Sequence, residues 1–371
     1  MKRSTHRQLL TTHIGSLHRP AALREAAEDR REEAITEAVR EVVARQVEAG
    51  IDVVSDGDMS KPSYSTYIAE RATGFGGSRK EPRRWLEAED FPDWGGPKIE
   101  INLDPLPPAV PAVVGDIRRI DTGAAERDAA NLAAAVTEAG AAEGFLTAAS
   151  PGVLTIFMEN QHYPSHDAYI EALIPVMREE YEAAYRAGLL VQIDSPDLSA
   201  FDVQFPGMPL DEWKRVAAAH LDAINAATAG IPPEAMRLHV CWGNHEAPHT
   251  RDIALREILP NLLRARPAAL CIQAANPRHE HEWRVFEDIK LPEDKILIPG
   301  VIDTTTSFVE HPELVAERIM RFARVVGPER LIAGTDCGFA TFADHYNLTP
   351  SISYAKLRSL VAGAALASGQ L

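Results

Sequence analysis

Short apolar runs alternate with helical stretches along most of this chain, and this rhythm constrains its fold more than any other feature of the sequence. Brief apolar runs that end in polar residues are typical of buried parallel strands, whereas the longer stretches between them repeat their apolar residues with a helical period. This rhythm predicts a parallel sheet covered by helices, which is an α/β fold. The predicted strands span or end at residues 11–16, 52–56, 145–148, 189–194, 237–241, 269–273, 296–301 and 331–336.

One stretch after the second strand breaks the rhythm. Residues 74–106 are rich in glycine, proline, tryptophan and charge, which is typical of a long excursion, and 112–115 is predicted as an extra hairpin strand. With this insertion of about 74–120 set aside, eight strands remain, which favours a closed (β/α)8 TIM barrel over an open sheet. We therefore expect residues 1–371 to form a single domain. The helices singled out between strands span about 20–50, 167–187, 210–229, 250–266 and 312–326.

Composition disfavours several classes of function. The chain has 54 acidic and 38 basic residues and a formal net charge of -16, which disfavours a phosphate-tracking surface and therefore nucleic acid. No apolar run approaches the ~18 residues that span a membrane, and no apolar leader follows the basic start. Three cysteines are an odd, sparse set that is typical of reduced thiols. We expect a cytoplasmic protein with no membrane partner.

Polar residues recur where the predicted strands end. Barrel active sites form at the carboxyl ends of the strands, so these side chains are candidates for a site. A single polar residue there is usually a helix cap, but recurrence at nearly every strand is harder to explain by capping. The residues concerned are Ser16, Asp56, Asp58, Asp194, His239, Cys241, Gln273, Asn276, Asp303, Asp336 and Cys337.

An imidazole and two thiols stand out in this set. His239 and Cys241 are two apart on the fifth strand, so their side chains point to the same face, and Cys337 follows the eighth strand between Asp336 and Gly338. One histidine and two thiolates are a familiar zinc set that keeps one position for substrate. The alternative is a core histidine beside a buried cysteine. Cys271, two before Gln273, is expected to be core.

Zinc at such a site suits the chemistry of sulfur. A free thiol has a pKa near ~8.5 and is mostly protonated at neutral pH. Coordination to a dication deprotonates the thiol and holds it toward an electrophilic carbon. The pattern therefore predicts a zinc-dependent enzyme that alkylates a small thiol, with an alkyl donor as second substrate.

Several motifs resemble the catalytic half of cobalamin-independent methionine synthase, and the resemblance runs over nearly the whole chain. This family is a (β/α)8 barrel with a zinc site. Its motifs match 11–17 (TTHIGSL), 55–59 (SDGDM), 192–196 (QIDSP), 239–241 (HVC), 300–303 (GVID) and 335–338 (TDCG). The resemblance implies that His239, Cys241 and Cys337 bind zinc and that Ser16, Asp58 and Asp194 bind a thiol amino acid.

Two departures from that family concern the zinc site and acid catalysis. Gln273 occupies the position of a fourth zinc ligand that is a glutamate in the family. We therefore take Gln273 as the fourth ligand, with Glu280 and His279 as alternatives. Threonine in the segment 300–306 (GVIDTTT) replaces a histidine that the family uses after the seventh strand.

A closer resemblance is to the epoxyalkane:coenzyme M transferase branch of the same superfamily. It rests on 239–244 (HVCWGN), 274–283 (AANPRHEHEW) and 308–313 (FVEHPE). In that branch a zinc-bound thiol opens an epoxide. Asn276 and Arg278 are therefore predicted to bind substrate, with Arg278 placed to neutralise a carboxylate or sulfonate. Asp194 and His279 are predicted to be catalytic, with His279 as a general acid.

Three further functions stay open at this point. The shared thiol-binding pattern at Ser16, Asp58 and Asp194 also suits a methyltransferase that makes methionine from homocysteine. A non-catalytic barrel that binds zinc or a thiol would explain Gln273 as the mark of a decayed site. Cofactor-free decarboxylation on the related porphyrinogen scaffold is the most remote. A homo-oligomer is compatible with all of them.

Overall fold

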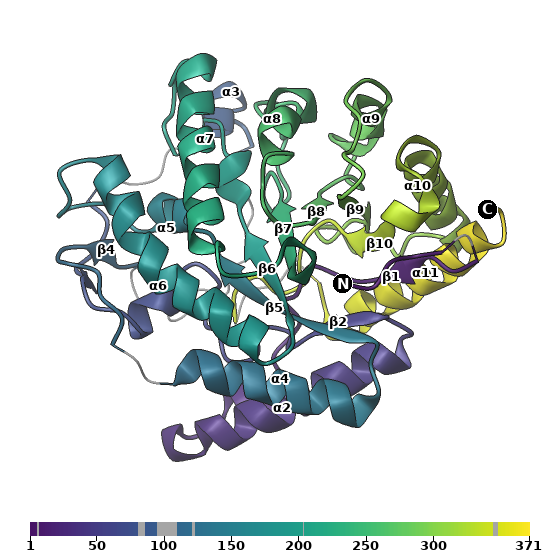
Figure 1. Ribbon diagram of the computed structural model, residues 1–371, viewed down its shortest axis with the longest axis horizontal. Coiled ribbons are helices and arrows are strands. Elements are labelled where there is room, and N and C mark those ends of the chain that lie inside the picture. The colour runs from purple at the N-terminus through teal and green to yellow at the C-terminus, as the bar shows by residue number, and fades with distance from the viewer. Residues whose placement is uncertain (6, 81–85, 95–109, 121–122, 203, 344–347) are drawn as a thin grey trace.

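The main sheet of this computed structural model is a ring of eight parallel strands. The structure describes residues 1–5, 7–80, 86–94, 110–120, 123–202, 204–343 and 348–371. The strands follow the order β1-β10-β9-β8-β7-β6-β5-β2, and a parallel bridge from Thr12 to Val53 joins the two ends of this order. Figure 1 shows the strands at the centre with helices around them. The predicted (β/α)8 barrel is therefore confirmed.

The bounds of the strands agree with the apolar runs of the sequence. All residues of β6 to β10 are buried, because helices cover the outside of the ring while side chains fill its interior. The barrel strands are β1 Leu10–Thr11, β2 Val53–Ser55, β5 Glu143–Ala149, β6 Leu190–Asp194, β7 Met236–Val240, β8 Ala269–Ile272, β9 Ile296–Ile302 and β10 Ile332–Thr335.

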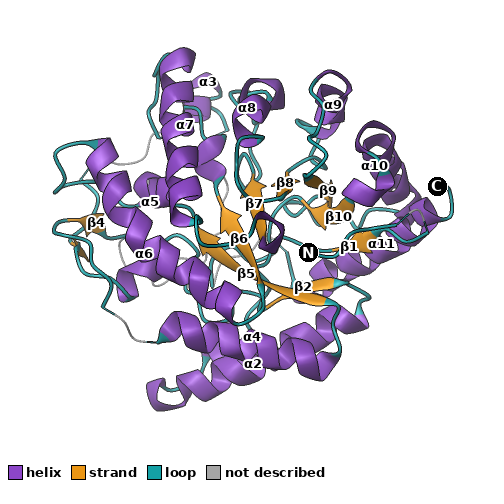
Figure 2. Cartoon of the chain, viewed as in Figure 1, coloured by secondary structure: helices purple, strands orange, loops and turns teal. Residues whose placement is uncertain are grey.

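Helices form the outer layer, as the secondary structure in Figure 2 shows. In α10 the buried residues Val315, Ile319, Phe322 and Val326 recur at helical spacing, so one apolar stripe packs inward. None of the described helices combines the length and apolar character of a membrane-spanning segment. The helices are α1 Ala21–Arg24, α2 Arg31–Glu48, α3 Leu86–Asp90, α4 Ala124–Ala139, α5 Pro151–Phe157, α6 His166–Arg186, α7 Leu210–Ala227, α8 Leu255–Leu262, α9 Val285–Asp288, α10 Pro312–Val326 and α11 Pro350–Ser368.

Two predicted helices are shorter than the sequence pattern suggests. The stretch 20–50 is broken into α1, a 3-10 turn and α2. The stretch 250–266 is helical only in α8. The backbone N–H of Thr250 donates to the side chain of Glu87, and that of Leu255 donates to Glu282. Glutamate side chains from distant segments thus accept backbone N–H groups before and at the first residue of α8, and the helix begins at Leu255 and not at residue 250.

The insertion after β2 forms the expected hairpin. Strands β3 (Phe75–Gly76) and β4 (Ala112–Val113) pair antiparallel, as predicted for 112–115. Helix α3 lies between them in sequence, and Figure 1 places it near α7 and α8. Because Glu87 of α3 accepts from Thr250, the insertion is attached to the loop between β7 and α8.

His13 ties β1 to its neighbours as a neutral imidazole. Its Nε2 donates to Gln46 Oε1 at 2.6 Å, and its Nδ1 accepts from the Gly15 N–H at 3.2 Å. Burial lowers the pKa of His13 from 6.5 to about 4. A proton on Nδ1 would break the bond from Gly15, so the buried ring favours the neutral form.

We expect this histidine to make the protein less stable in acid. As the pH falls, His13 takes up a proton in the unfolded chain before it does so in the folded chain. The contribution of neutral His13 to the free energy of unfolding is therefore complete above pH 6.5 and is lost progressively down to about pH 4. One proton corresponds to about 1.4 kcal/mol per pH unit. The free energy of unfolding is measured in urea at several pH values between 4.5 and 7 and plotted against pH. In His13→Gln the slope of this plot should be smaller than in the wild type by the amount that corresponds to nearly one proton. An unchanged slope would contradict this assignment.

Candidate metal centre

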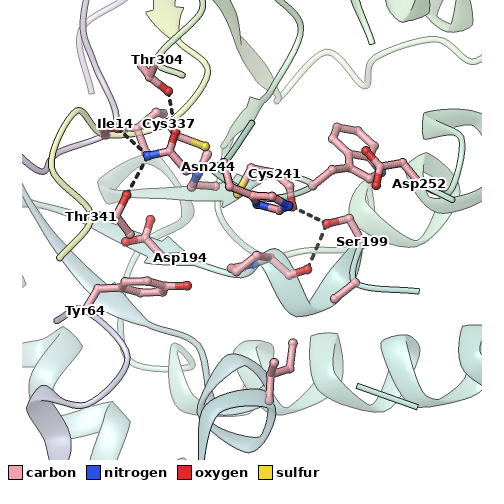
Figure 3. A pocket seen from close by; sticks show the side chains of 18 of the residues that line it. Ile14, Tyr64, Asp194, Ser199, Cys241, Asn244, Asp252, Thr304, Cys337 and Thr341 are labelled. Atoms are coloured by element: carbon pink, nitrogen blue, oxygen red, sulfur yellow. Dashed lines mark hydrogen bonds between the residues drawn. The ribbon is translucent and has the colours of Figure 1, made fainter. Parts of the chain in front are cut away.

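The structure brings the three predicted ligands His239, Cys241 and Cys337 together. One ligand atom from each lies within 4.8 Å of those of the other two, and this is the metal-compatible group found among the described His, Cys, Asp and Glu residues. His239 is in β7, Cys241 directly follows that strand, and Cys337 follows β10. Figure 3 shows Cys241 and Cys337 in the wall of one cavity. Cys241 and Cys337 are 96 positions apart in sequence, but they lie in one cluster because β7 and β10 end at the same rim of the barrel.

Burial and charge prepare these groups to bind a cation. The three side chains are 3–7% exposed, and His239 Nδ1 is buried without a hydrogen-bond partner. A hydrogen bond from Cys337 and the charge of His239 lower the pKa of Cys241, and the same hydrogen bond together with burial raises that of Cys337. Burial opposes a charged His239, but the neighbouring Cys241 thiolate outweighs it and raises the pKa of the ring. The two shifts favour a Cys241 thiolate beside a protonated His239 in this buried cluster, and a bound cation would take the place of that proton.

Asp336 fixes the backbone beside Cys337. Its carboxylate accepts the N–H groups of Ala274 and Ala275 at 2.8 Å and of Asn276 at 3.0 Å. A Cβ on Gly300 would lie 2.0 Å from Asp336 Oδ1, so only glycine fits in β9 at this point. The carboxylate therefore joins the ends of β8, β9 and β10 under the ligand cluster.

Gln273 supports the ligand loop through its side-chain amide. Its Oε1 accepts the Trp242 N–H at 2.8 Å, and its Nε2 donates to Gly243 O at 3.4 Å. The oxygen that a metal would need thus holds the segment directly after Cys241. A role of Gln273 as the fourth ligand stays a prediction. Glu280, an alternative fourth ligand, forms ion pairs with Arg318 and Arg321.

A cavity of about 280 Å³ opens in front of the cluster. Its outer wall is largely aromatic and aliphatic, with Tyr64, Phe157, Phe201, Phe339 and Phe342 among its residues. Leu86 and Glu87 of α3 also line it, so the insertion contributes to the site. Arg251 pairs with Asp90 of α3 and with Asp202, which holds this short helix against the loop after β7.

The three residues predicted to bind a thiol amino acid all line the cavity. Asp194 ends β6, and burial raises its pKa to about 7. Ser16 lies so close to Gly338 that a Cβ there would be 1.9 Å from its Oγ. Asp58 differs from a free carboxylate, because its Oδ1 is 2.7 Å from Lys61 Nζ and accepts from Thr147. Burial opposes the charge of Asp58, but Lys61 and Arg19 outweigh it and lower its pKa.

The structure does not place the other predicted residues in the cavity wall. His279 is buried behind Trp242, whose ring stacks on it at 3.9 Å, and both of its ring nitrogens bind carboxylates, Glu282 and Asp252. Asn276 Oδ1 accepts the N–H groups of the two residues that follow Pro277. Arg278 is exposed and donates to Thr250 O. Direct roles of these three residues in catalysis or substrate binding stay predictions without geometric support.

Asn244 is a cavity residue that the sequence did not single out. Its Nδ2 donates to Gly338 O at 2.8 Å and to Thr341 Oγ1 at 2.7 Å, and its Oδ1 accepts from Thr304. Figure 3 shows this bridge between the loops that follow β7, β9 and β10. The quoted motif HVCWGN contains Asn244, so its position three residues after Cys241 was the available signal.

Comparisons with known proteins identify the family of this chain. Residues 104–359 match the model of the family described as "Cobalamin-independent synthase, Catalytic domain". A methionine synthase from Saccharolobus solfataricus is 25% identical over 367 residues, which cover 96% of this chain and 93% of that protein. A 2-hydroxypropyl-CoM lyase from Xanthobacter autotrophicus is 25% identical over 244 residues, which cover 59% of this chain and 60% of that protein.

Solved structures support the same fold. A B12-independent methionine synthase from Shewanella sp. W3-18-1, in complex with selenomethionine, aligns with a TM-score of 0.75 at 22% identity, and the alignment covers 98% of both chains. A putative enzyme of that type from Listeria monocytogenes aligns with a TM-score of 0.65. The family match spans more than half of the chain and confirms the resemblance drawn from its motifs. This chain therefore belongs to the cobalamin-independent synthase catalytic-domain family.

Proposed function

We propose that this protein is a zinc-dependent transferase that alkylates a small thiol at sulfur. The observation that carries the proposal is the meeting of His239, Cys241 and Cys337 within 4.8 Å at the inner end of a cavity. The named relatives, methionine synthases and a CoM lyase, support it because both names refer to sulfur compounds.

The donor set fits zinc. One imidazole and two thiolates are typical of catalytic zinc sites, in which the remaining position belongs to substrate. The buried Nδ1 of His239 has no hydrogen-bond partner in the described structure, so the hydrogen bonds of the fold do not occupy both ring nitrogens of this residue. When bound, zinc supplies the positive charge that keeps a thiol deprotonated at neutral pH.

The chain's own residues position the two substrates. Asp194 and Ser16 line the inner cavity beside the ligand cluster, where they can accept hydrogen bonds from polar groups of the thiol. The aromatic outer wall excludes water and holds the carbon chain of the alkyl donor. In the reaction the S–C bond forms as the bond from carbon to the leaving group breaks. If the donor is an epoxide, the resulting alkoxide takes up a proton from solvent, which balances the proton that the thiol releases when it binds as a thiolate.

Methyl transfer to homocysteine is the second candidate. It is favoured by the relatives named methionine synthase, which cover nearly the whole chain, whereas the CoM lyase match covers 59% of it. The two candidates share the thiol half of the reaction and differ in the donor. Thr304 and the α3 residues Leu86 and Glu87 line the same cavity.

Metal analysis combined with turnover assays tests the proposal. We expect about one zinc per chain in the purified protein, and S-alkylated product with zinc present but none after chelation. Two reactions are compared, namely 2-mercaptoethanesulfonate with epoxypropane and homocysteine with methyl donors. Product in the first reaction supports the epoxide reading, and methionine supports the second candidate. Tight zinc binding without any effect of thiols on the metal would refute an enzymatic role and leave a binding protein.

A further inference from the structure

Arg237 is a buried cation without a carboxylate partner. Its side chain is 1% exposed inside the barrel. Nη1 donates to Thr12 Oγ1 at 3.0 Å, Nη2 donates to His13 O at 2.7 Å, and the guanidinium carbon lies 4.0 Å above the Phe145 ring. Its Nε has no hydrogen-bond partner, and the ion pairs of the described residues include none to Arg237. All of its partners are uncharged.

This arginine lies one layer below the ligand cluster. It precedes His239 by two residues in β7, so both side chains point into the barrel, about 6.6 Å apart along the strand. The neighbouring strand brings Cys271 opposite His239 and Ala269 opposite Arg237. Arg237 also forms a hydrogen bond with the Cys271 thiol, and its charge acts on the His239 ring.

Other charged groups also lie near the cluster, namely Lys61 and Arg19 beside Asp58, and the carboxyl groups of Asp194 and Asp336. Lys61 is paired with Asp58. The Asp194 carboxyl accepts from Gln192 Nε2 at 2.7 Å and points into the cavity, as Figure 3 shows. His13 is neutral, since its Nδ1 accepts from a backbone N–H. Arg237 adds a buried cation beneath the cluster that forms no ion pair within the described structure.

A charge count shows what a bound thiolate adds to the metal and its ligands. This step rests on the proposed function. A divalent zinc ion, two cysteine thiolates and a neutral imidazole sum to zero, and a substrate bound as a thiolate changes the sum to one negative charge. An unpaired cation buried in a low-dielectric interior is costly, and an anion a few ångströms away offsets that cost. Asp194 and Asp336 already place carboxyl groups beside the cluster, so a bound thiolate adds further negative charge to this interior, and Arg237 is a buried cation that offsets it.

We propose that Arg237 is the buried counter-charge that favours the thiolate form of the substrate in the site. Arg237 would act on the substrate through its electric field and not through direct contact, so it is not itself a catalytic residue. Because the bare zinc site is neutral in this count, Arg237 should matter for an anionic ligand of the fourth position and not for a neutral one. A comparison of anionic with neutral ligands therefore distinguishes this electrostatic role from a structural role, which would affect the binding of both classes alike.

Calorimetry on the zinc-loaded full chain tests the proposal with two small probes. The probes are 2-mercaptoethanol, which binds as an anion, and imidazole, which binds as a neutral ligand. In Arg237→Met we expect about tenfold or more weaker binding of the thiol at pH 7. The variant should also need a higher pH to release the thiol proton, which buffers of different ionisation enthalpy report. Imidazole affinity should change by less than about twofold, and Arg237→Lys should restore most of the thiol affinity.

Lys356→Met is the matched control. Lys356 is also fully buried, but it is paired with Glu310 at 3.0 Å. Its loss should lower the free energy of unfolding without changing the ratio of thiol to imidazole affinity. If Arg237→Met does not fold, Arg237→Gln, which keeps a donor for Thr12 and His13, is expected to show the same loss.

The outcomes separate the two proposals. If Arg237→Met or its substitute weakens both probes equally, or leaves thiol binding unchanged, the counter-charge role is overturned while the proposed function stands. If the wild-type chain binds neither zinc nor the thiol, the proposed function fails and the role of Arg237 fails with it. If Arg237→Met loses thiol binding but keeps imidazole binding, and Arg237→Lys restores thiol binding, the result supports both the proposed function and the role of Arg237.

Discussion

Replacing Cys337 with serine is expected to abolish zinc retention and thiol alkylation together while the barrel stays folded. The serine hydroxyl is a neutral, hard oxygen that does not replace a thiolate, and removal of one of three protein ligands should weaken zinc on the order of a hundredfold or more. Cys337 follows β10 and is not part of the apolar core of the barrel interior, so the cost to folding is small. After dialysis against a chelator, zinc per chain should fall from about one to nearly zero.

The control is Cys271→Ser, at the third buried thiol. Cys271 packs in the barrel interior with Leu10, Ile14 and Ile298. This variant should lose stability but retain zinc, because burial raises the pKa of this thiol and it lies outside the ligand group. Zinc content measured by atomic emission and circular dichroism measured in parallel distinguish the two losses. Full zinc occupancy in Cys337→Ser would remove the basis of the proposed function.

Asp336→Ala should be the most destabilising of the substitutions considered for this chain. It leaves the backbone N–H groups of Ala274, Ala275 and Asn276 buried without an acceptor and opens a space against Gly300. Each unsatisfied buried donor costs about 1–3 kcal/mol, so a loss of about 3 kcal/mol or more is expected. Since Asp336 directly precedes Cys337, zinc affinity should fall as well.

Urea unfolding with and without zinc measures both effects. Asp222→Ala is the matched control, because Asp222 is an exposed carboxylate paired with Arg264. Exposed pairs of this kind contribute about 0–1 kcal/mol. We expect the control to change the unfolding free energy little and to leave zinc binding intact. Equal, small effects for Asp336 and Asp222 would show that Asp336 does not organise the ends of β8 to β10.

The sequence was sufficient to predict the barrel and the meeting of His239, Cys241 and Cys337 at one rim. Eight apolar runs separated by helical stretches allow few folds other than a ring of parallel strands, because both faces of each strand must be buried. Once the ring is predicted, His239 and Cys241 must share a face, and Cys337 must lie at the same rim. These conclusions follow from local periodicity and topology alone.

The sequence could not predict which polar side chains would face one another across loops. His279, the predicted general acid, instead stacks behind Trp242, and the Gln273 oxygen, the predicted fourth ligand, accepts the Trp242 N–H. Both outcomes depend on hydrogen-bond partners from other segments, which no local pattern encodes. The same holds for α3, which the sequence indicated only as part of an excursion and which lines the cavity.

The sequence by itself thus determined the order of strands and helices and the rim at which the predicted metal ligands meet, because hydrophobic periodicity is a local property of the chain. Only the tertiary structure decided which groups point into the cavity, which carboxylates are already paired, and that Arg237 lies unpaired beneath the cluster. Those features depend on distances between residues far apart in the chain, and they are fixed only when the ring of strands closes.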